Sequence, residues 1–246
     1  MSEIFSSYYY YRLLWTALDL LFPPVCGGCG KVGVRWCAGC QRTVQRLAAP
    51  ICDICGDTLD RDPGLCIHCM RARPQYRLLR SWSAFEGPLR NAIHRLKYRR
   101  DIGLADALAS QLPGFVFDLH WPFDLIVPVP LGRKRIRERG YNQVALIARP
   151  LSMAMKIAYA PDALMRERET LSQVGLSRND RRNNVCGAFR AKKHFVNGRI
   201  VLVIDDVATT GSTLSSCAEA LYAAGARDVF ALTLARAVSQ RNLTAA

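Results

Sequence analysis

The segment from residue 200 to residue 214, IVLVIDDVATTGSTL, constrains the fold more than any other part of the chain. Its first five residues are apolar and mostly β-branched, which is typical of a parallel strand buried on both faces. Asp205 and Asp206 follow at the carboxyl end of this strand, where parallel sheets carry their ligand-binding loops. The segment therefore predicts an α/β fold with a ligand site directly after the strand.

The loop after the two aspartates has the composition of an anion-binding site. Gly211 permits positive φ, the hydroxyl groups donate hydrogen bonds, and the amide groups opening a helix at Thr213 point toward an anion. The carboxylates can accept hydrogen bonds from neighbouring ribose hydroxyls. We therefore predict that this segment binds a ribose 5-phosphate. The predicted binding residues are Asp205, Asp206, Ala208, Thr209, Thr210, Gly211, Ser212 and Thr213.

The loop differs from a nucleoside-triphosphate P-loop, because the lysine and the spacing of GxxxxGK[ST] are absent. ATP binding is therefore disfavoured. The segment instead resembles the phosphoribosyl-pyrophosphate motif of type I phosphoribosyltransferases. That resemblance implies that Asp205 and Asp206 take the ribose hydroxyls and that residues 208–213 take the 5-phosphate. The alternative is an ordinary strand-turn-helix with a surface aspartate pair, and the length of the match argues against it.

Eight of the ten cysteines form four C-x-x-C pairs, a spacing that suits zinc better than disulfides. Segments this short could scarcely form a core without a metal. We therefore predict one or two zinc ions and a reducing compartment. The predicted ligands are Cys26, Cys29, Cys37, Cys40, Cys52, Cys55, Cys66 and Cys69.

Two pairings of these cysteines are compatible with the spacing. Sequential pairing makes one site from residues 26–40 and another from residues 52–69, whereas interleaved, RING-like pairing mixes the two halves. We favour sequential pairing because each half has its own compact loop. His68 could replace a cysteine but is expected to be a bystander, and Cys186 and Cys217 are expected to be buried thiols. The module is either a platform for DNA or a protein partner, or purely structural.

The positive charge of the chain is concentrated in its middle. The formal net charge is +14, and residues 76–199 alone carry 23 Lys and Arg against 10 acidic residues, a balance of +13. Two zinc-bound tetrads would lower the total to about +10. A field of this sign attracts nucleic acid or phosphate-rich small molecules.

The chain divides into three predicted parts: an N-terminal helix at 1–25, a double zinc ribbon at 26–75 and a phosphoribosyltransferase-like α/β domain at 76–240. No segment approaches the ~20 apolar residues of a membrane span, so we expect a cytoplasmic protein. The N-terminal helix is amphipathic and is expected to dock on the zinc module, with membrane-surface contact as the alternative.

The middle of the chain predicts a strand at 77–84 and then two helices joined near residues 101–103. Lys97 lies at the end of the first helix, where a cation either offsets the helix dipole or binds phosphate. Residues 124–130 read as a second buried strand, followed by a basic loop. In that loop Arg133 and Arg139 are candidates for contacts to pyrophosphate or DNA, and a solvated basic face is the alternative.

Residues 170–189 are polar and rich in Gly, Ser, Asn and Arg, the composition of a mobile active-site flap. Arg178 and Arg181 are its candidate phosphate or DNA contacts. After the phosphate loop, the pattern predicts a helix at 214–224 and a last strand at 229–237.

Taken in chain order, five blocks resemble the ComF family, which includes GntX-like proteins, over about residues 20–237. These blocks are the C-x-x-C pairs, FEGPLRNAIHRLKY, VPVPLGRKRIRERGYNQ, TLSQVGLSRNDRRNNVCGAF and VLVIDDVATTGSTL. Two positions depart from the family pattern: Gly132 stands where a histidine is common, and Cys186 where a basic residue is common. Phosphate contacts at these two points are therefore in doubt.

The resemblance implies a phosphoribosyltransferase-like domain behind a double zinc ribbon, and phosphoribosyl pyrophosphate bound with Mg²⁺. It also implies a role in natural transformation, where imported single-stranded DNA is handled in the cytoplasm, with single-stranded DNA and competence-machinery proteins as partners.

Two functions follow from this resemblance. In the first, the phosphoribosyltransferase fold is a binding or sensing domain in single-stranded DNA handling. In the second, the protein is an active transferase on a nucleobase or nucleotide-like acceptor. It would then stabilise an oxocarbenium-like centre between the 128–140 loop and residues 205–213. Nothing in the sequence identifies the attacking nucleophile, so no catalytic residue is predicted.

Overall fold

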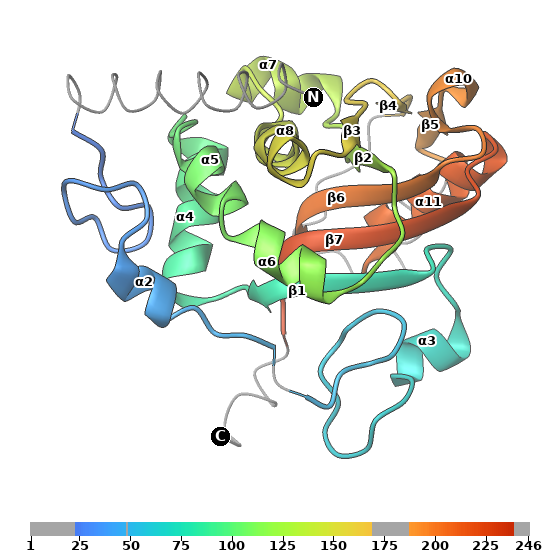
Figure 1. The fold of residues 1–246 in the computed structure, drawn as a ribbon, viewed down its shortest axis with the longest axis horizontal. Coiled ribbons are helices and arrows are strands. Elements are labelled where there is room, and N and C mark those ends of the chain that lie inside the picture. The colour runs from blue at the N-terminus through green and yellow to red at the C-terminus, as the bar shows by residue number, and fades with distance from the viewer. Residues whose placement is uncertain (1–22, 48, 169–186, 239–246) are drawn as a thin grey trace.

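The computed structural model describes residues 23–47, 49–168 and 187–238. Within this part of the chain, five parallel strands form a central sheet in the order β1-β7-β6-β2-β3 (Figure 1). Its strands are β1 Leu78–Ala84, β2 Leu125–Pro128, β3 Ala158–Tyr159, β6 Ile200–Ala208 and β7 Asp228–Arg236. A separate antiparallel pair joins β4, Leu164–Arg166, to β5, Phe189–Ala191.

The strand β6 lies in the centre of the sheet and is buried on both faces, as its unbroken apolar run predicts. Side chains alternate along a strand, so Ile200, Leu202 and Ile204 enter one core while Val201 and Val203 enter the other. The strand is paired in parallel with β7 and β2, which brings the carboxyl ends of all three to one edge of the sheet.

Helices cover both faces of the sheet (Figure 1). One face packs against α4 Gly87–Tyr98, α5 Leu104–Ala109, α6 Leu112–Asp118 and α8 Gln143–Met155. The opposite face packs against α11 Ser212–Ala223, the β4–β5 pair and the second cysteine module. The predicted fold class, a parallel sheet flanked by helices, is therefore confirmed.

The cysteine region contains two short helices, α2 Ala38–Arg42 and α3 Ile67–Arg71. Figure 1 shows the two halves of this region as separate lobes, the first beside α4 and the second against β1. A further short helix, α10 Lys193–Val196, precedes β6. The second lobe lies at the sheet because its cysteines share a core with β1 and α11.

The basic segment after β2 is not the irregular loop that the sequence analysis predicts. Residues Arg133–Arg139 form the helix α7, which Gly140 ends with a φ of 82°. The reason is local: the segment consists of Arg, Lys, Ile and Glu, most of them good helix formers, and a glycine accepts the left-handed conformation that closes a helix. The prediction of two helices joined near residues 101–103 is confirmed by α4 and α5, but the following α6 was not anticipated.

Among the described residues, no helix combines the length and apolar character that crossing a bilayer requires. The predicted N-terminal helix lies almost entirely outside the described residues. The same is true of most of the predicted flap, including Arg178 and Arg181.

Candidate functional site

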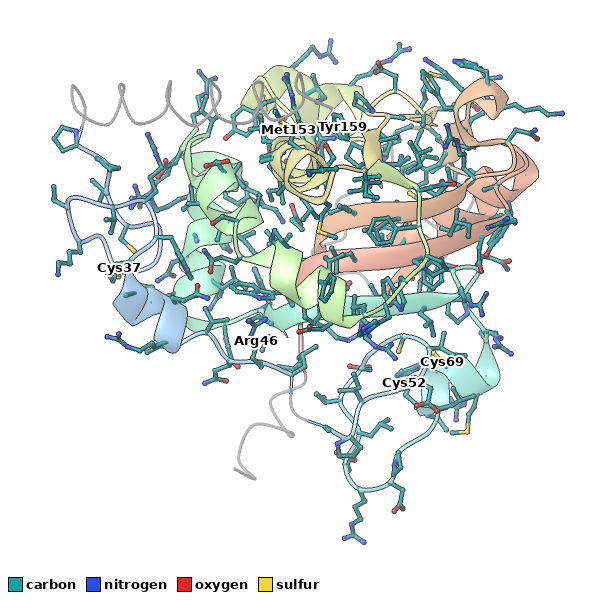
Figure 2. All side chains as sticks on the ribbon, in the orientation of Figure 1. Cys37, Arg46, Cys52, Cys69, Met153 and Tyr159 are labelled. Atoms are coloured by element: carbon teal, nitrogen blue, oxygen red, sulfur yellow. The ribbon has the colours of Figure 1, made fainter. Side chains whose placement is uncertain are left out.

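The eight predicted zinc ligands form two separate tetrads, and within each one the sulfur atoms lie within 4.8 Å of one another. The first tetrad is Cys26, Cys29, Cys37 and Cys40, and the second is Cys52, Cys55, Cys66 and Cys69. The sequential pairing is therefore confirmed and the interleaved pairing is wrong. Figure 2 shows the separation, with Cys37 on one lobe and Cys52 and Cys69 on the other.

The sulfur positions fit four-coordinate zinc. The Sγ atoms of Cys26 and Cys40 are 3.6 Å apart, and those of Cys29 and Cys37 are 3.7 Å apart. A tetrahedron with Zn–S bonds of about 2.3 Å has edges of about 3.8 Å, so these distances leave room for one metal ion at each centre. His68 belongs to neither tetrad, as predicted.

The second tetrad also has the electrostatics of a cation site. A hydrogen bond from Cys69, opposed by burial and assisted by the charge of Arg236, lowers the pKa of the Cys55 thiol to about 5. Burial raises the pKa of the Cys66 thiol to about 11. Four sulfur atoms this close compete for protons, and a bound metal removes that competition because it favours the thiolate form of each.

The first tetrad is attached to α4. The Nδ2 atom of Asn91 donates a hydrogen bond to the carbonyl oxygen of Gly28 at 3.0 Å, and Nη1 of Arg95 donates to that of Cys26 at 3.2 Å. Both donors lie on one stripe of the helix, four residues apart. The knuckle is therefore held by its backbone, which leaves its sulfur atoms to the metal.

The second tetrad is attached to the sheet through Arg236, which is only 1% exposed at the end of β7. Its Nη1 atom donates to the carbonyl oxygen of Cys55 at 2.7 Å, and its Nε atom donates to Oδ1 of Asp57 at 3.0 Å. The amide of Leu79 in the edge strand β1 adds a 2.8 Å bond to the carbonyl oxygen of Ile54. Sequence reasoning missed Arg236, because nothing near it in the chain marks it as special.

Asp205 and Asp206 lie at the carboxyl end of β6 and have different surroundings. Asp206 is 5% exposed, and its two oxygens accept hydrogen bonds from Nζ of Lys97 at 2.8 Å and from Nε2 of Gln143 at 2.6 Å. Asp205 is partly exposed, and its Oδ1 accepts the amide hydrogen of Asp206 at 2.8 Å. Asp205 therefore keeps some exposed surface, although its carboxyl group is itself enclosed by protein.

Burial, followed by the negative charge of Asp206, raises the pKa of Asp205 to about 7. The amide of Asp206 and the positive charges of Lys97 and Arg166 act in the opposite direction and are outweighed. A carboxyl group in this state gains from a cation or from hydrogen-bond donors, because both favour its ionised form.

The loop after β6 has the geometry of a helix N-terminus opened by glycine. Gly211 has a φ of 76° and α11 begins at Ser212, one residue earlier than predicted. The Oγ1 atom of Thr210 lies 2.6 Å from Oγ of Ser212 and accepts the Ser212 amide hydrogen at 3.3 Å. A Cβ atom at Gly211 would lie 2.7 Å from the hydroxyl oxygen of Tyr76, so contact as well as φ requires glycine.

The second cysteine module borders this loop. The backbone amide of Gln75 donates to Oγ of Ser215 on α11 at 3.0 Å. A cavity with a volume of about 50 Å³ lies between the second tetrad and the loop, and Tyr76, Thr210 and Arg236 are among its lining residues. The module therefore lies beside the predicted phosphate loop.

The structure brings two of the predicted basic residues to the Asp206 side of β6. Lys97 is bonded to Asp206, and Arg139 donates through Nη1 to Oε1 of Gln143 at 2.8 Å. Gln143 was not among the predicted site residues, and its position at a helix start beside the basic run was the available signal. Arg133 is exposed at the beginning of α7. Its role remains a prediction.

Known proteins resemble this chain in its cysteine region and over most of its length. A family model described as the double zinc ribbon domain matches residues 17–70. A solved structure of adenine phosphoribosyltransferase is similar at 16% identity and a TM-score of 0.37, over 56% of this chain and 75% of that chain.

Three curated relatives match most of the chain. Competence protein F of Haemophilus influenzae is 34% identical, over 82% of this chain and 90% of its own. DNA utilization protein YhgH of Escherichia coli is 34% identical, over 81% and 89%. Competence protein ComFC of Bacillus subtilis is 28% identical, over 90% and 89%. The chain therefore belongs to the ComF family, and its double zinc ribbon and helix-flanked parallel sheet are the two parts that the sequence resemblance implied.

Proposed function

We propose that this protein binds phosphoribosyl pyrophosphate together with Mg²⁺ at the carboxyl end of β6, and that it acts in the handling of imported single-stranded DNA in the cytoplasm. One observation carries the ligand assignment. Asp205 and Asp206 lie near the carboxyl end of the buried central strand β6, and a short loop leads from that strand to the glycine-opened helix α11. Parallel sheets bind phosphorylated ligands at such ends.

The residues at this end of β6 have different proposed roles. The carboxylate of Asp205, for which hydrogen-bond donors would offset its burial, accepts hydrogen bonds from the ribose hydroxyls. The hydroxyl groups of Thr210 and Ser212, with the first amides of α11, receive the 5-phosphate. Lys97 and Gln143 each donate to one oxygen of the buried Asp206, so that residue first holds the site together.

Magnesium fits the donor set at this end of β6. Mg²⁺ prefers oxygen ligands and is usually held by one or two carboxylates together with substrate phosphates. Asp205 supplies such an oxygen, and the bound cation would neutralise the charge of the pyrophosphate. Arg139 lies on the same side of β6 through its bond to Gln143, where it adds fixed positive charge.

The DNA-handling part of the proposal is supported by the relatives and by the charge of the chain. Two of the relatives are named as competence proteins and one as a DNA utilization protein. The balance of +13 over residues 76–199 is the charge that a polyanionic partner needs.

Isothermal titration calorimetry with phosphoribosyl pyrophosphate, with and without Mg²⁺, tests the ligand assignment. We expect binding that requires Mg²⁺ and that Asp205→Asn weakens about 10- to 100-fold, because the hydrogen bonds of an ionised acceptor are lost. Asp118→Asn, an exposed carboxylate at the end of α6, makes the same charge change away from β6 and should bind as the wild type does.

Absence of heat with the wild-type protein would refute the ligand assignment. Equal weakening by Asp118→Asn would show a general charge effect instead. The same protein incubated with the ligand and a panel of nucleobases distinguishes binding from transfer. Binding without pyrophosphate release supports the sensing role, whereas release would establish a transferase.

A further inference from the structure

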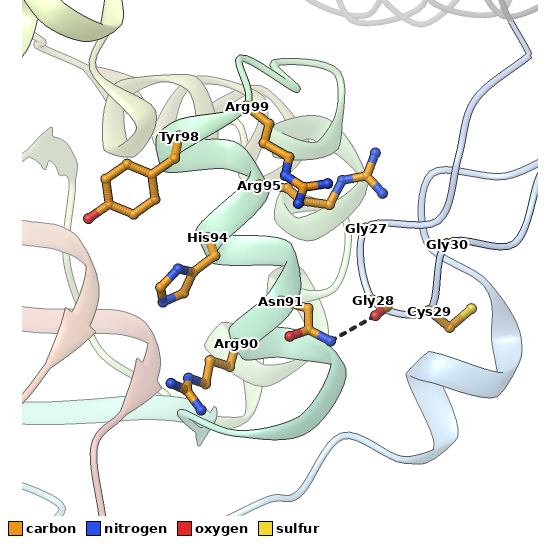
Figure 3. Close-up of a pocket in the computed structure, with 10 residues that line it drawn as sticks. All are labelled: Gly27, Gly28, Cys29, Gly30, Arg90, Asn91, His94, Arg95, Tyr98 and Arg99. Atoms are coloured by element: carbon orange, nitrogen blue, oxygen red, sulfur yellow. Dashed lines mark hydrogen bonds between the residues drawn. The ribbon is translucent and has the colours of Figure 1, made fainter.

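A pocket of about 570 Å³ lies between the first cysteine tetrad and α4, on a part of the molecule that the proposed ligand site does not use (Figure 3). One wall is the backbone of residues 27–30, which is the first knuckle. The other wall is α4, which contributes two adjacent stripes of side chains. Figure 3 shows Asn91, Arg95 and Arg99 facing the knuckle and Arg90, His94 and Tyr98 on the neighbouring side of the helix.

The pocket carries positive charge and no carboxylate among its lining residues. Arg95 is held in place, because it bonds to Asp101 at 2.8 Å and to the backbone of the knuckle. Arg90 and Arg99 are exposed, and neither has a carboxylate partner within the described ranges 23–47, 49–168 and 187–238. Two guanidinium groups are thus available to an anion.

The stripe of α4 that carries Arg90 also presents aromatic rings to solvent. Tyr98 is 68% exposed, and its ring centroid lies 5.6 Å from that of His94, which in turn lies 6.2 Å from Phe85. Burial, together with the charges of Arg90 and Lys97, lowers the pKa of His94, so its ring is uncharged at neutral pH. An exposed aromatic ring beside fixed arginines is the arrangement that proteins use to stack unpaired bases while holding the phosphates.

The dimensions favour a strand over a mononucleotide. Arg90 and Tyr98 are eight residues apart, or about 12 Å along the helix axis. That distance exceeds the roughly 3.4 Å rise per nucleotide of one DNA strand, so the helix can follow more than one nucleotide. A base can stack on Tyr98 only if one face of the base is free. Both faces of a base inside a duplex are covered by its neighbours, so the geometry favours an unpaired strand.

We infer that this pocket binds a single strand of DNA, with one base stacked on Tyr98 and backbone phosphates held by Arg90 and Arg99. The inference rests on the proposed DNA-handling function and assigns it a location. The first cysteine module forms one wall of this pocket, on the side of α4 that Arg99 faces.

The pocket is also connected to the site at the end of β6. Tyr98 follows Lys97, whose amine is bonded to Asp206. The guanidinium carbon of Arg139 lies 5.3 Å from the centroid of the Tyr98 ring, and the same guanidinium bonds to Gln143. A base on Tyr98 would therefore compete with or reinforce contacts that position Asp206, which couples strand binding to ligand binding.

Fluorescence anisotropy with a labelled oligothymidylate, measured with the full-length protein across a range of salt concentrations, tests the inference. Tyr98→Ala should weaken binding about 5- to 100-fold, whereas Tyr98→Phe should retain it, because stacking needs the ring and not the hydroxyl. The double variant Arg90→Ala/Arg99→Ala should reduce the slope of log K against log salt by about 1.4, the value for two phosphate contacts on a single strand.

The matched control is Lys193→Ala/Arg227→Ala. It removes two exposed positive charges near the amino ends of β6 and β7, away from the pocket. This control should keep the wild-type slope. A strand carrying 2-aminopurine should be quenched by the wild type and by Tyr98→Phe but not by Tyr98→Ala. Because Tyr98 is largely exposed, its truncation is not expected to unfold the protein, and a circular dichroism spectrum verifies this.

The outcomes separate the inference from the function on which it rests. The wild type could bind the strand while the pocket variants and the control weaken binding equally, or while none of them changes it. Either result would overturn the pocket assignment and leave the DNA-handling proposal intact. No strand binding by the wild type would overturn both the pocket and the DNA-handling proposal. The calorimetric result with phosphoribosyl pyrophosphate stands independently of either outcome.

Discussion

Two neighbouring aspartates do different things in this protein. Asp206 is buried and accepts one hydrogen bond at each oxygen, from Lys97 and from Gln143, whereas the carboxyl group of Asp205 has a pKa that burial raises to about 7. Because successive side chains of a strand point in opposite directions, an Asp-Asp pair need not act as a matched pair of acceptors. The carboxylate that holds this end of β6 together and the one that we propose to face the ligand therefore belong to different residues.

The raised pKa of Asp205 predicts a pH dependence of stability in the ligand-free protein. The folded state binds more protons at this residue than the unfolded state between pH ~4 and pH ~7, so its contribution to the free energy of unfolding falls as pH rises through that window. In the Asp205→Asn variant the side chain at position 205 has no titrating group. The variant should therefore gain stability relative to the wild type, by at most about 1.4 kcal/mol for each pH unit.

Urea unfolding of both proteins at intervals from pH 4 to pH 8 measures this difference. Asp118→Asn, an exposed carboxylate, provides the comparison and should show no such trend. A difference between Asp205→Asn and the wild type that stays constant over the window would show that Asp205 titrates as an ordinary carboxyl group.

The helices and strands show which elements the sequence could predict. The beginning of the strand β6 and both ends of the helix α11 were placed to within one or two residues, because an unbroken apolar run and a glycine at positive φ are both local signals. The strand continues past the predicted end at Ile204 and includes both aspartates. The helix α7 was missed because its charge suggested a phosphate-binding loop, although its residues are good helix formers. The short β4–β5 pair carries no pattern long enough to predict.

The attachment of the second cysteine module to the end of β7 predicts a large stability effect at one residue. Arg236→Met removes the buried guanidinium and leaves the carboxylate of Asp57 and the carbonyl oxygen of Cys55 without their donor. We expect the free energy of unfolding to fall by about 3–5 kcal/mol, as it does when one partner of a buried ion pair is removed. Chemical denaturation followed by circular dichroism gives the value.

Arg77→Met is the matched control for this change, because Arg77 also pairs with an aspartate, Asp228, but its side chain is 63% exposed. Such a surface pair contributes little to stability, because water and salt screen its charges. If the two variants lost similar stability, the buried contact of Arg236 would not be what fastens the module to the sheet.

For the protein as a whole, the two zinc tetrads have unequal roles. The cysteines of the second belong to the same core as β1 and α11, whereas those of the first lie outside both cores and are held on α4 by two hydrogen bonds to their knuckle. The second tetrad is therefore part of what stabilises the sheet, and the first is an attachment to it.

Removing one tetrad at a time should separate these roles. Cys26→Ser/Cys29→Ser and Cys52→Ser/Cys55→Ser should each lose one zinc ion, measured by elemental analysis of the purified protein. The thermal unfolding midpoint should fall only slightly in the first variant and markedly in the second, because only the second tetrad shares a core cluster with the sheet. Equal shifts in the midpoint would contradict this division.

The limits of sequence reasoning follow from distance along the chain. The zinc pairing was predictable because each tetrad closes within one short loop. The bond of Lys97 to Asp206 joins residues 109 positions apart, and that of Arg236 to Asp57 joins residues 179 apart. No local pattern encodes such contacts, since they depend on which strands become neighbours in the sheet. The candidate ligand could be predicted from a motif, but its surroundings could not.

The contact between Arg236 and Asp57 also sets an order of events during synthesis. At about 5–20 residues per second, the ribosome finishes β7 roughly 10–35 s after it finishes the second knuckle. Over that interval the edge strand β1 also lacks β7, the strand with which it pairs in the finished sheet. The tetrads close locally and need no distant residue, so zinc can fold the knuckles first. The nascent chain would then carry a zinc-bound second cysteine module before β7 is made. When β7 joins the sheet, its Arg236 would dock on that module.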